Sequence, residues 1–460
     1  MIPFAFLCLT VALAADPPFL FQHKFSSTVS PCDDFNEYVC NLNENEGTSW
    51  TDELQNRFMH DLLTYFNEYS DPIIDFIRQI YARDLEGTEF TYDQWFALNR
   101  RIILSNEPAP YVNFIVPKLV RENGLWMPDE KLEELKDVYR AVNEEIVESI
   151  KEQSWIPQDQ VDHVTSVIGN VEPYLYFPEA SKDPDNIKIA LKFFDEAFVD
   201  HLQSFEKYLS NPECGTSCLL AHLNSFLLST LYKYIDNFSG TPEYIHYWLI
   251  EGAPFPVGAW NSLGGDAKMA VLPAMSHYMN HTLPRGLLYS TIAWQIGHEI
   301  FHNVDSSKWG VRGASGLHNV SHYERGFQCF ADFYGSFPSK APNGTFLYPD
   351  GQLKQNEGFC DVEGFRVALK AVKKLLERTT ETVESDHSGI EWFFLGAGLT
   401  YCHRADDYSQ FVFLKDRPHP RFSVRINAVA LQTSEFSEVF KCKPGDPMYF
   451  ESSRCEIFTS

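Results

Sequence analysis

Apolar residues recur at three- and four-residue intervals through most of the first half of the chain, a spacing that is typical of helices with one buried face. The pattern extends from residue 51 to about residue 240 of the 460 residues. The three clearest stripes are Phe58, Leu62, Leu63 and Phe66; Ile73, Phe76, Ile77 and Ile80; and Leu132, Leu135, Val138, Val142, Ile146 and Ile150. Further helices are predicted over residues 186–209 and 219–236. These segments predict a helical lobe that buries its apolar faces.

The pattern changes at about residue 245. Prolines and glycines mark loops between residues 254 and 265, and the short extended segment Lys268–Leu272 follows. Two helix-length stretches come next, Leu287–Asn303 and Gln352–Arg378. A chain of 460 residues exceeds one ordinary core, so two lobes are expected. The predicted fold class is mainly α (α+β), with an N-terminal segment and helical lobe over 16–245 and a second lobe with a small sheet over 246–460.

The amino-acid composition indicates a packed interior, and the net charge excludes some kinds of binding partner. Hydrophobic residues make up 44% of the chain, which is ample for packed interiors. The formal net charge is -26, from 63 acidic and 37 basic residues. Such a charge repels nucleic acids and anionic membranes, so neither is expected as a partner.

The N-terminus predicts export. Residues 1–15 form an apolar run that is shorter than the roughly 20 residues of a membrane span. Ala12 and Ala14 supply the small residues of a cleavage site, so the run is interpreted as a signal peptide; retention as an anchor is the alternative. No other stretch is apolar and long enough to span a bilayer, and stable membrane insertion is not expected.

The cysteines and sequons agree with an extracellular location. Of ten cysteines, Cys8 lies in the predicted signal peptide, and the remaining nine cluster partly at both chain ends, which suggests bridges that tie the ends together. Four glycosylation sequons begin at Asn237, Asn280, Asn319 and Asn343. The expected protein is therefore a secreted, disulfide-containing glycoprotein.

Residues His298–His302 read HEIFH, an HExxH motif inside the predicted helix 287–303. Residues four apart on a helix share a face, so His298 and His302 can bind one zinc ion while Glu299 points at the open coordination position. Glu299 is then the base that takes a proton from water. The alternative is a structural helix whose histidines form ordinary hydrogen bonds.

A catalytic zinc site needs a third protein ligand. Glu357 lies 55 residues after His302, within the predicted helix 352–378, and Asp361 follows on the same face. Glu357 is predicted to bind zinc, and Asp361 is predicted to accept the second N–H of a ligating histidine.

These motifs resemble those of the neprilysin family of zinc endopeptidases, whose zinc site is similar to that of thermolysin. The resemblance is strongest over residues 250–460. The family pattern ENIAD corresponds to Glu357–Asp361, and Pro31–Cys40 matches the family's PCxDFYxYxC opening. Ser434–Met448 matches the closing run. The resemblance implies a thermolysin-like zincin catalytic lobe over residues 246–460, one Zn²⁺ ion per chain, and peptides as substrates.

The resemblance also implies roles for two residues near the C-terminus. His419 and Arg425 keep the family's six-residue separation. By similarity, His419 stabilises the oxyanion and Arg425 holds a backbone carbonyl of the substrate. The orienting carboxylate, Asp361, pairs in the family with the first histidine, here His298.

The family pattern implies four disulfides: Cys32–Cys442, Cys40–Cys402, Cys214–Cys218 and Cys329–Cys455. Cys360 is left over, inside the zinc-ligand helix. It is interpreted as a packed, unreactive thiol; competition for the metal or sensitivity to oxidation is the alternative.

Two departures from the family bear on function. The family's substrate-binding Asn-Ala pair corresponds here to Gly258-Ala259, so the asparagine side chain is absent. The helical lobe is also far shorter than the family's; a more open cleft that admits larger peptides and a site less sheltered from water are the two alternatives. The sequence therefore predicts a zinc endopeptidase of extracellular oligopeptides, with a catalytically silent relative that binds peptides or a protein partner as the alternative.

Overall fold

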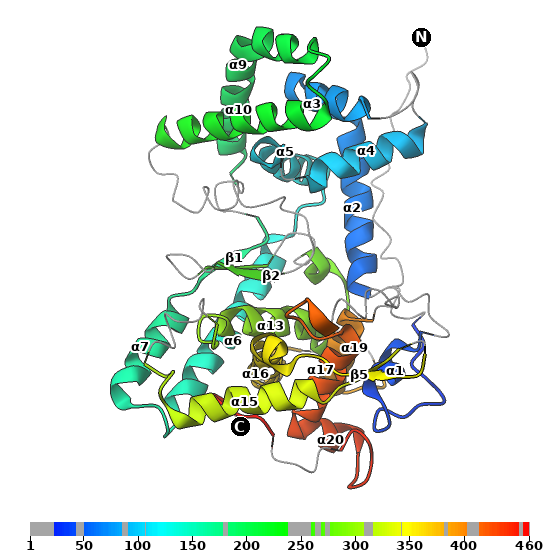
Figure 1. The fold of residues 1–460 in the computed structure, drawn as a ribbon, viewed down its shortest axis with the longest axis vertical. Helices are drawn as coiled ribbons and strands as arrows, with labels where there is room; N and C mark the ends of the chain where they lie inside the picture. Colours follow the sequence, from blue (N-terminus) through cyan, green and yellow to red (C-terminus); the bar gives the residue numbers. More distant parts are fainter. Residues whose placement is uncertain are drawn as a thin grey trace, which may run out of the picture.

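The computed structural model describes most of the chain in two lobes (Figure 1). The described residues are 23–42, 50–84, 91–105, 107–177, 183–237, 259–262, 268–271, 277–307, 316–341, 343–380, 385–402, 414–449 and 454–459. The predicted signal peptide lies outside them. The long helix α2 runs from one lobe to the other (Figure 1).

The upper lobe in Figure 1 is entirely helical in the described residues. It contains α3 (Pro72–Ala82), α4 (Tyr92–Leu104), α5 (Ala109–Glu122), α9 (Pro184–Leu209) and α10 (Thr216–Asn237), together with the upper part of α2 (Trp50–Glu68). The apolar stripes predicted for α2 and α3 are buried, which confirms the helical periodicity. Local capping sets two starts: Asp71 accepts from Ile74 N at 2.7 Å, and Thr91 with Gln94 forms a capping box on α4.

The lower lobe is built around one buried helix, α13 (Arg285–Phe301). Every residue of α13 from Gly286 to Phe301 is buried. Around it pack α6 (Asp129–Lys151), α16 (Gly351–Arg378) and α17 (Gly389–Thr400). The other described helices of this lobe are α1 (Phe35–Cys40), α7 (Gln158–Gly169), α15 (Ser321–Gly335), α19 (Phe422–Leu431), α20 (Ser434–Phe440) and the single 3₁₀ turn η2 (His277–Asn280).

A small sheet lies beside α13. Its order is β1 (Glu172–Leu175), β3 (Lys268–Val271), β2 (Ala259–Ser262), with β1 parallel and β2 antiparallel to β3. The extended segment predicted from Lys268 is confirmed, and β2 occupies an edge of the sheet. A separate hairpin pairs β4 (Ser339–Lys340) with β5 (Phe346–Leu347). The mainly helical class with a small sheet is therefore confirmed.

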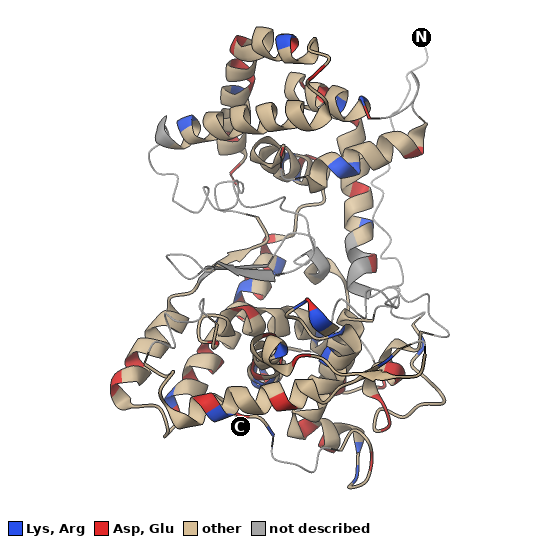
Figure 2. Cartoon of the chain, viewed as in Figure 1, with Lys and Arg blue, Asp and Glu red and all other residues tan. Residues whose placement is uncertain are grey.

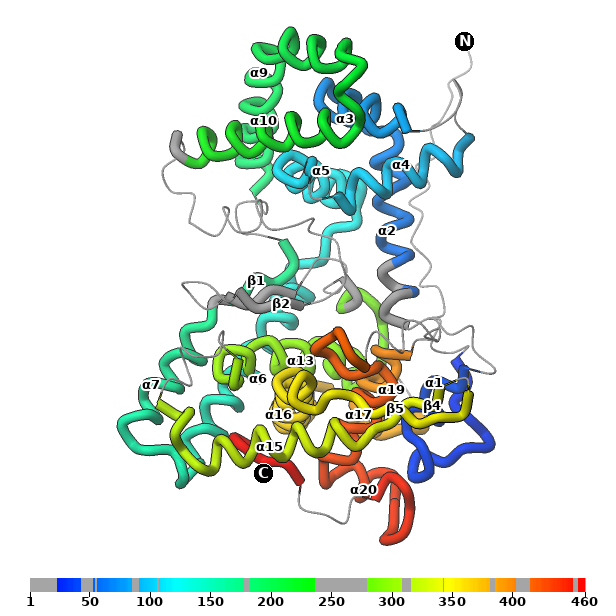
Figure 3. The backbone as a smooth tube through the Cα atoms, viewed as in Figure 1, coloured from blue at the N-terminus to red at the C-terminus, as the bar shows by residue number. Residues whose placement is uncertain are grey.

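The two lobes do not divide at residue 245 in space. Helices α6 and α7 precede that residue but lie in the lower lobe (Figure 3). Trp155 Nε1 donates to the carbonyl of Ile457 at 3.0 Å, and Lys374 Nζ lies 2.5 Å from Glu145 Oε2. The apolar stripe of α6 faces α13 and α16. Periodicity identifies a buried face, but it does not identify the neighbour that covers the face.

All four disulfides implied by the family resemblance are present, which confirms that pairing. Cys32–Cys442 and Cys40–Cys402 attach the short helix α1 to C-terminal segments, and Cys329–Cys455 attaches the chain end to α15. Cys360 is the one free cysteine among the described residues, and it is buried. Among the described helices, none has the length and hydropathy of a membrane span. Acidic and basic residues are distributed over both lobes (Figure 2).

Candidate metal centre

The C-terminal turn of α13 places two histidines on one face. His298 lies in the last turn, and His302 is the C-cap residue with backbone angles that are still helical, φ -59° and ψ -19°. Four residues make slightly more than one turn, so both rings point the same way. Their Nε2 atoms are 3.2 Å apart. Glu299 lies between them in sequence and is 7% exposed.

Helix α16 crosses α13 and adds a carboxylate to this pair. Glu357 Oε2 is 3.3 Å from His298 Nε2 and 3.7 Å from His302 Nε2. Tetrahedral zinc with N and O ligands has bonds of about 2.0–2.2 Å, which separates its ligand atoms by about 3.3–3.5 Å. Oε2 is buried, and its nearest described partners are histidine nitrogens at 3.0–3.7 Å. These residues therefore fit a zinc ion.

The second nitrogen of each histidine is held by a carboxylate. His298 Nδ1 donates to Asp361 Oδ1 at 2.9 Å, and His302 Nδ1 donates to Asp305 Oδ2 at 2.9 Å. Both contacts favour the tautomer whose Nε2 lone pair faces Glu357. Asp305 is not among the residues predicted from the sequence. It lies three residues after the last histidine of the HExxH motif, beyond the end of α13.

These carboxylates also control the protonation of the ligands. Burial lowers the pKa of His302, but the hydrogen bond to Asp305 and the charge of Glu357 outweigh it and raise the pKa to about 9. The pKa of His298 is likewise raised, because hydrogen bonds to Asp361 and Glu357 outweigh burial. We therefore expect metal binding here to release protons and to weaken as the pH falls.

Arg425, on α19, donates two hydrogen bonds to the carboxylate of Asp361. Its Nε lies 2.8 Å from Asp361 Oδ2 and its Nη2 lies 2.5 Å from Oδ1, and Arg425 is 5% exposed. Burial raises the pKa of Asp361, but Arg425 and His298 outweigh it, so the net shift is downward. Arg425, for which the resemblance implies a substrate contact, is thus already held by Asp361.

His419 lies at the open side of the three ligand atoms. Its Nε2 is 3.0 Å from Glu357 Oε2, and its side chain is 44% exposed. The structure therefore brings His419 next to the ligand set, although it lies 62 residues after Glu357 in the sequence. Its Nε2 faces the ligand carboxylate, so the ring borders the predicted metal site.

The edge strand predicted to receive the peptide lies near the same helix. Ala259 begins β2 and pairs with Val271 of β3, and β2 packs near α13. Gly258 lies outside the described residues.

The buried thiol of Cys360 lies against His302, with its Sγ 3.4 Å from Nδ1. Burial raises the pKa of this thiol, and the carboxylates of Asp305 and Glu357 raise it further. A fully buried, protonated thiol supports the interpretation of a packed, unreactive side chain.

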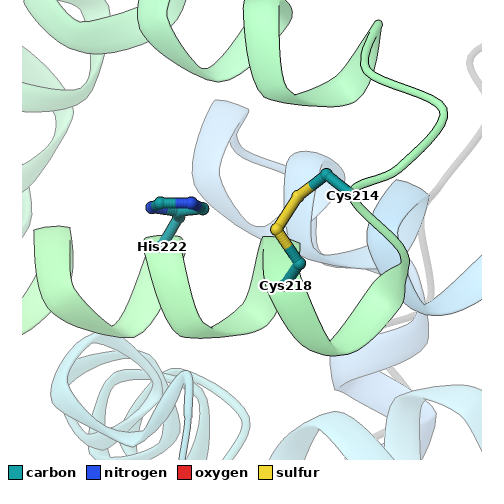
Figure 4. Close-up of side chains that lie close together, drawn as sticks. All are labelled: Cys214, Cys218 and His222. Carbon is teal, nitrogen blue, oxygen red and sulfur yellow. A yellow bond between two sulfur atoms is a disulfide. The ribbon is translucent and has the colours of Figure 1, made fainter.

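A second cluster with metal-ligand chemistry lies in the upper lobe. Cys214, Cys218 and His222 lie close together, but the two sulfurs are joined to each other (Figure 4). The ring of His222 stacks on Tyr208 with centroids 3.8 Å apart. Because the disulfide joins both sulfurs, neither is a thiolate that could bind a metal, and we interpret this cluster as structural.

Two glycines allow the close crossing of α13 and α16. A Cβ on Gly364 would lie 2.5 Å from the backbone nitrogen of His298, and a Cβ on Gly297 would lie 2.6 Å from the carbonyl oxygen of Gly364. Backbone atoms cannot move aside cheaply, so any side chain here separates the two helices that carry the ligands.

Gly364→Ala is therefore expected to destabilise the protein by about 1–3 kcal/mol and to lower its zinc affinity. Denaturant unfolding and zinc titration measure the two effects. Gly335→Ala is the matched control, since its Cβ would lie at ordinary contact distances of 3.6 Å from Gly351 Cα and 3.8 Å from Gly351 N. Equal zinc affinity in the two variants would show that the close crossing does not position the ligands.

Lys354 links the ligand helix to the segment before His419. Its ammonium donates to the carbonyl oxygen of Arg417, and Lys354 is 2% exposed. Burial lowers the pKa of Lys354 to about 8, against the opposing charges of Asp350, Asp416 and Glu357. Lys354 is thus placed to hold the backbone that positions His419.

Lys354→Met is expected to lower kcat about tenfold with zinc content unchanged, because a loosened His419 donates less effectively. Steady-state kinetics and metal analysis test this, with Lys207→Met at an exposed position on α9 as the control. Lys354→Arg should recover part of the loss. A fall in zinc content instead of kcat would assign Lys354 to the metal site itself.

Two mostly helical lobes, with a buried HExxH helix and a carboxylate from a crossing helix, are the arrangement of a zincin-like metalloprotease. Residues 268–457 match the model of peptidase family M13. This match, together with relatives named neprilysin and endothelin-converting enzyme, supports a neprilysin-family M13 metallopeptidase, a family whose usual cofactor is zinc.

Relatives found by sequence similarity are also neprilysins. Neprilysin-1 of Caenorhabditis elegans is 28% identical over 200 residues, which cover 39% of this chain and 25% of that protein. Neprilysin-2 of Drosophila melanogaster is 21% identical over 341 residues, which cover 72% of this chain and 40% of that protein. The alignments thus span well under half the length of these relatives.

A solved structure agrees on the fold. The zinc metalloprotease Zmp1 of Mycobacterium tuberculosis, in its open state, aligns with a TM-score of 0.60 at 16% identity. The alignment covers 82% of this chain and 54% of that chain. The likeness confirms the two-lobed zincin fold.

Proposed function

We propose that the protein is a zinc-dependent endopeptidase that hydrolyses internal peptide bonds of extracellular oligopeptides. One observation carries the proposal: three ligand atoms converge at tetrahedral spacing, and both histidines are oriented by buried carboxylates. A structural helix has no need of that arrangement. Peptidase family M13 supplies the reaction class.

Zinc held by His298, His302 and Glu357 would supply the Lewis acid for hydrolysis. Glu299, next to His298 on the same turn, accepts a proton from the attacking water and returns it to the leaving amine. Asp361 and Asp305 hold the two histidine rings in a fixed orientation through both proton transfers. His419 donates to the oxygen on which negative charge develops.

The substrate in this proposal binds as an extended strand along β2, beginning at Ala259. Arg425 holds a substrate carbonyl next to Asp361, and the family favours an apolar residue on the leaving side. Gly258 supplies no side-chain amide, which removes a hydrogen bond worth about 0.5–1.5 kcal/mol. The reduced helical lobe limits substrate size less strictly than a full lobe would.

An extracellular location is part of the proposal. Support comes from the four disulfides, which persist in oxidising compartments. The sequon residues Asn319 and Asn343 are exposed. The predicted signal peptide supports the same location.

The second candidate is a catalytically silent relative that binds peptides or a protein partner. The specific observation in its favour is Gly258 in place of the family's asparagine, which weakens the grip on a substrate backbone. Its prediction differs from that of the enzyme, since such a protein holds zinc and peptides without cleaving them.

Purified zinc-loaded protein incubated with a mixed peptide library tests the proposal. We expect internal cleavage that a chelator abolishes and that added zinc restores, and we expect no cleavage by Glu299→Gln. Peptide binding without cleavage by folded, zinc-loaded protein would replace the enzyme with the silent relative.

A further inference from the structure

A small cavity lies away from the metal centre, where α16, the corner between α19 and α20, and the C-terminal segment meet. Its interior space is about 50 Å³, enough for a few water molecules or one monatomic anion. Arg366 and Lys370 of α16, Gln432 and Thr433 of the corner, and Arg454 line it.

Arginine, lysine and amide donors line this cavity beside the carboxylates of Glu435 and Glu456, and three polar groups have no partner among the described residues. Gln432 Oε1 accepts from the backbone N–H of Cys455 at 2.8 Å, and this contact fixes the orientation of the amide. Gln432 is 0% exposed, yet its Nε2 finds no acceptor among the described residues. The two N–H groups of Nε2 are therefore free to donate to a bound group.

Two further polar groups at this cavity are also buried without a hydrogen-bond partner among the described residues. The hydroxyl of Thr433, which is 2% exposed, has no partner among the described residues and makes no capping bond to α20. The Nε of Arg454 is also buried without an acceptor in the described part of the chain. A buried donor without an acceptor costs about 1–3 kcal/mol, so three around one cavity indicate a missing acceptor.

The charges around the cavity have an excess of cations. Glu435 is paired with Lys373 at 2.8 Å, and Arg366 has Glu363 at 3.7 Å. Lys370 and Arg454 remain in the lining, opposed by the exposed Glu456. Burial lowers the pKa of Arg366, which lies close enough to Arg454 for the two charges to repel. An anion satisfies the donors and offsets this repulsion, whereas water only satisfies the donors.

We propose that this cavity binds a small inorganic anion of the halide class, with chloride as the physiological ligand. The anion accepts from Gln432 Nε2, Thr433 Oγ1 and Arg454 Nε. It joins α16, which carries Glu357 and Asp361, to the corner that ends α19, which carries Arg425. Its expected effect is on the stability of this junction, and it does not depend on peptidase activity.

The first test is thermal unfolding of the zinc-loaded protein in sodium chloride and in sodium gluconate at equal ionic strength, because gluconate is too large for the cavity. We expect chloride to raise the melting temperature by about 2–4 °C. In Gln432→Glu the new carboxylate supplies the acceptor charge, and one oxygen still accepts from Cys455. The chloride effect should disappear in this variant. Gln158→Glu, which adds the same charge at an exposed position on α7, should retain it.

The second test locates the ion without any variant. Anomalous scattering from wild-type crystals soaked in bromide should show a peak within hydrogen-bond distance of Gln432 Nε2. Thr433→Val, which removes one donor without adding charge, should weaken the chloride effect if Gln432→Glu does not fold. Equal melting temperatures in chloride and gluconate, or a cavity without bromide, would show that water fills the space and would overturn the proposal.

Discussion

Glu299→Gln is expected to lower kcat/KM for peptide hydrolysis by about 10²–10⁴-fold while zinc content stays at the wild-type level. Glutamine has the shape of glutamate but cannot accept the proton of the attacking water. Glu299 is 7% exposed in the last turn of α13, between the two histidine ligands in sequence. It is absent from the convergent ligand group of His298, His302 and Glu357, so its replacement should leave the metal in place.

The experiment measures kinetics and metal content on the same preparations. Glu324→Gln, an exposed change on α15, is the matched control and should retain full activity. Zinc loss from Glu299→Gln would make Glu299 a ligand, and an unchanged rate with full zinc would require another base.

Asp361→Asn is expected to lower the free energy of unfolding by about 3–5 kcal/mol, because it leaves the buried charge of Arg425 without its partner. Asparagine can still accept from His298 Nδ1, but it cannot balance the guanidinium that now lies 2.5–2.8 Å from both carboxylate oxygens. A weaker acceptor also lowers the basicity of His298, and zinc affinity should fall about 10–100-fold.

Denaturant unfolding in chelator isolates the stability effect from zinc binding, and Asp162→Asn on the exposed face of α7 is the control. The pH dependence provides a signature. The pKa of Asp361 is lowered in the folded protein, so its contribution is complete above the unfolded pKa of about 3.9 and is lost only as the pH falls through the lower folded pKa. The difference between wild type and variant should therefore be constant near neutrality and shrink in acid. A pH-independent difference throughout would indicate a packing defect.

Many helices of both lobes were predictable from the sequence. Helices α2, α3 and α6 coincide with stripes of three- and four-residue periodicity, and the predicted helix-length stretches coincide with α9, α10, α13 and α16. Helices α4, α5, α15 and α17 were not individually predicted. Helix α17 illustrates the reason: from Phe393 to Thr400 it is buried on all sides, so apolar residues surround it and no stripe distinguishes one face.

The sequence by itself determined the ligand types and their local spacing. His298 and His302 are one turn apart, as are Glu357 and Asp361, and a helix turns each such spacing into a shared face regardless of its surroundings. The family resemblance extended this to the disulfides, which the structure confirms.

Only the tertiary structure decided how these faces meet. Three contacts join residues that lie far apart in the chain: the crossing at Gly297 and Gly364, the pairing of Arg425 with Asp361, and the packing of α6 in the metal-centre lobe. Asp305 is near in sequence, but it lies beyond the helix end, where helical spacing no longer predicts direction. Periodicity is a property of one element, whereas contacts between elements depend on which surfaces pack with the fewest voids and unpaired charges.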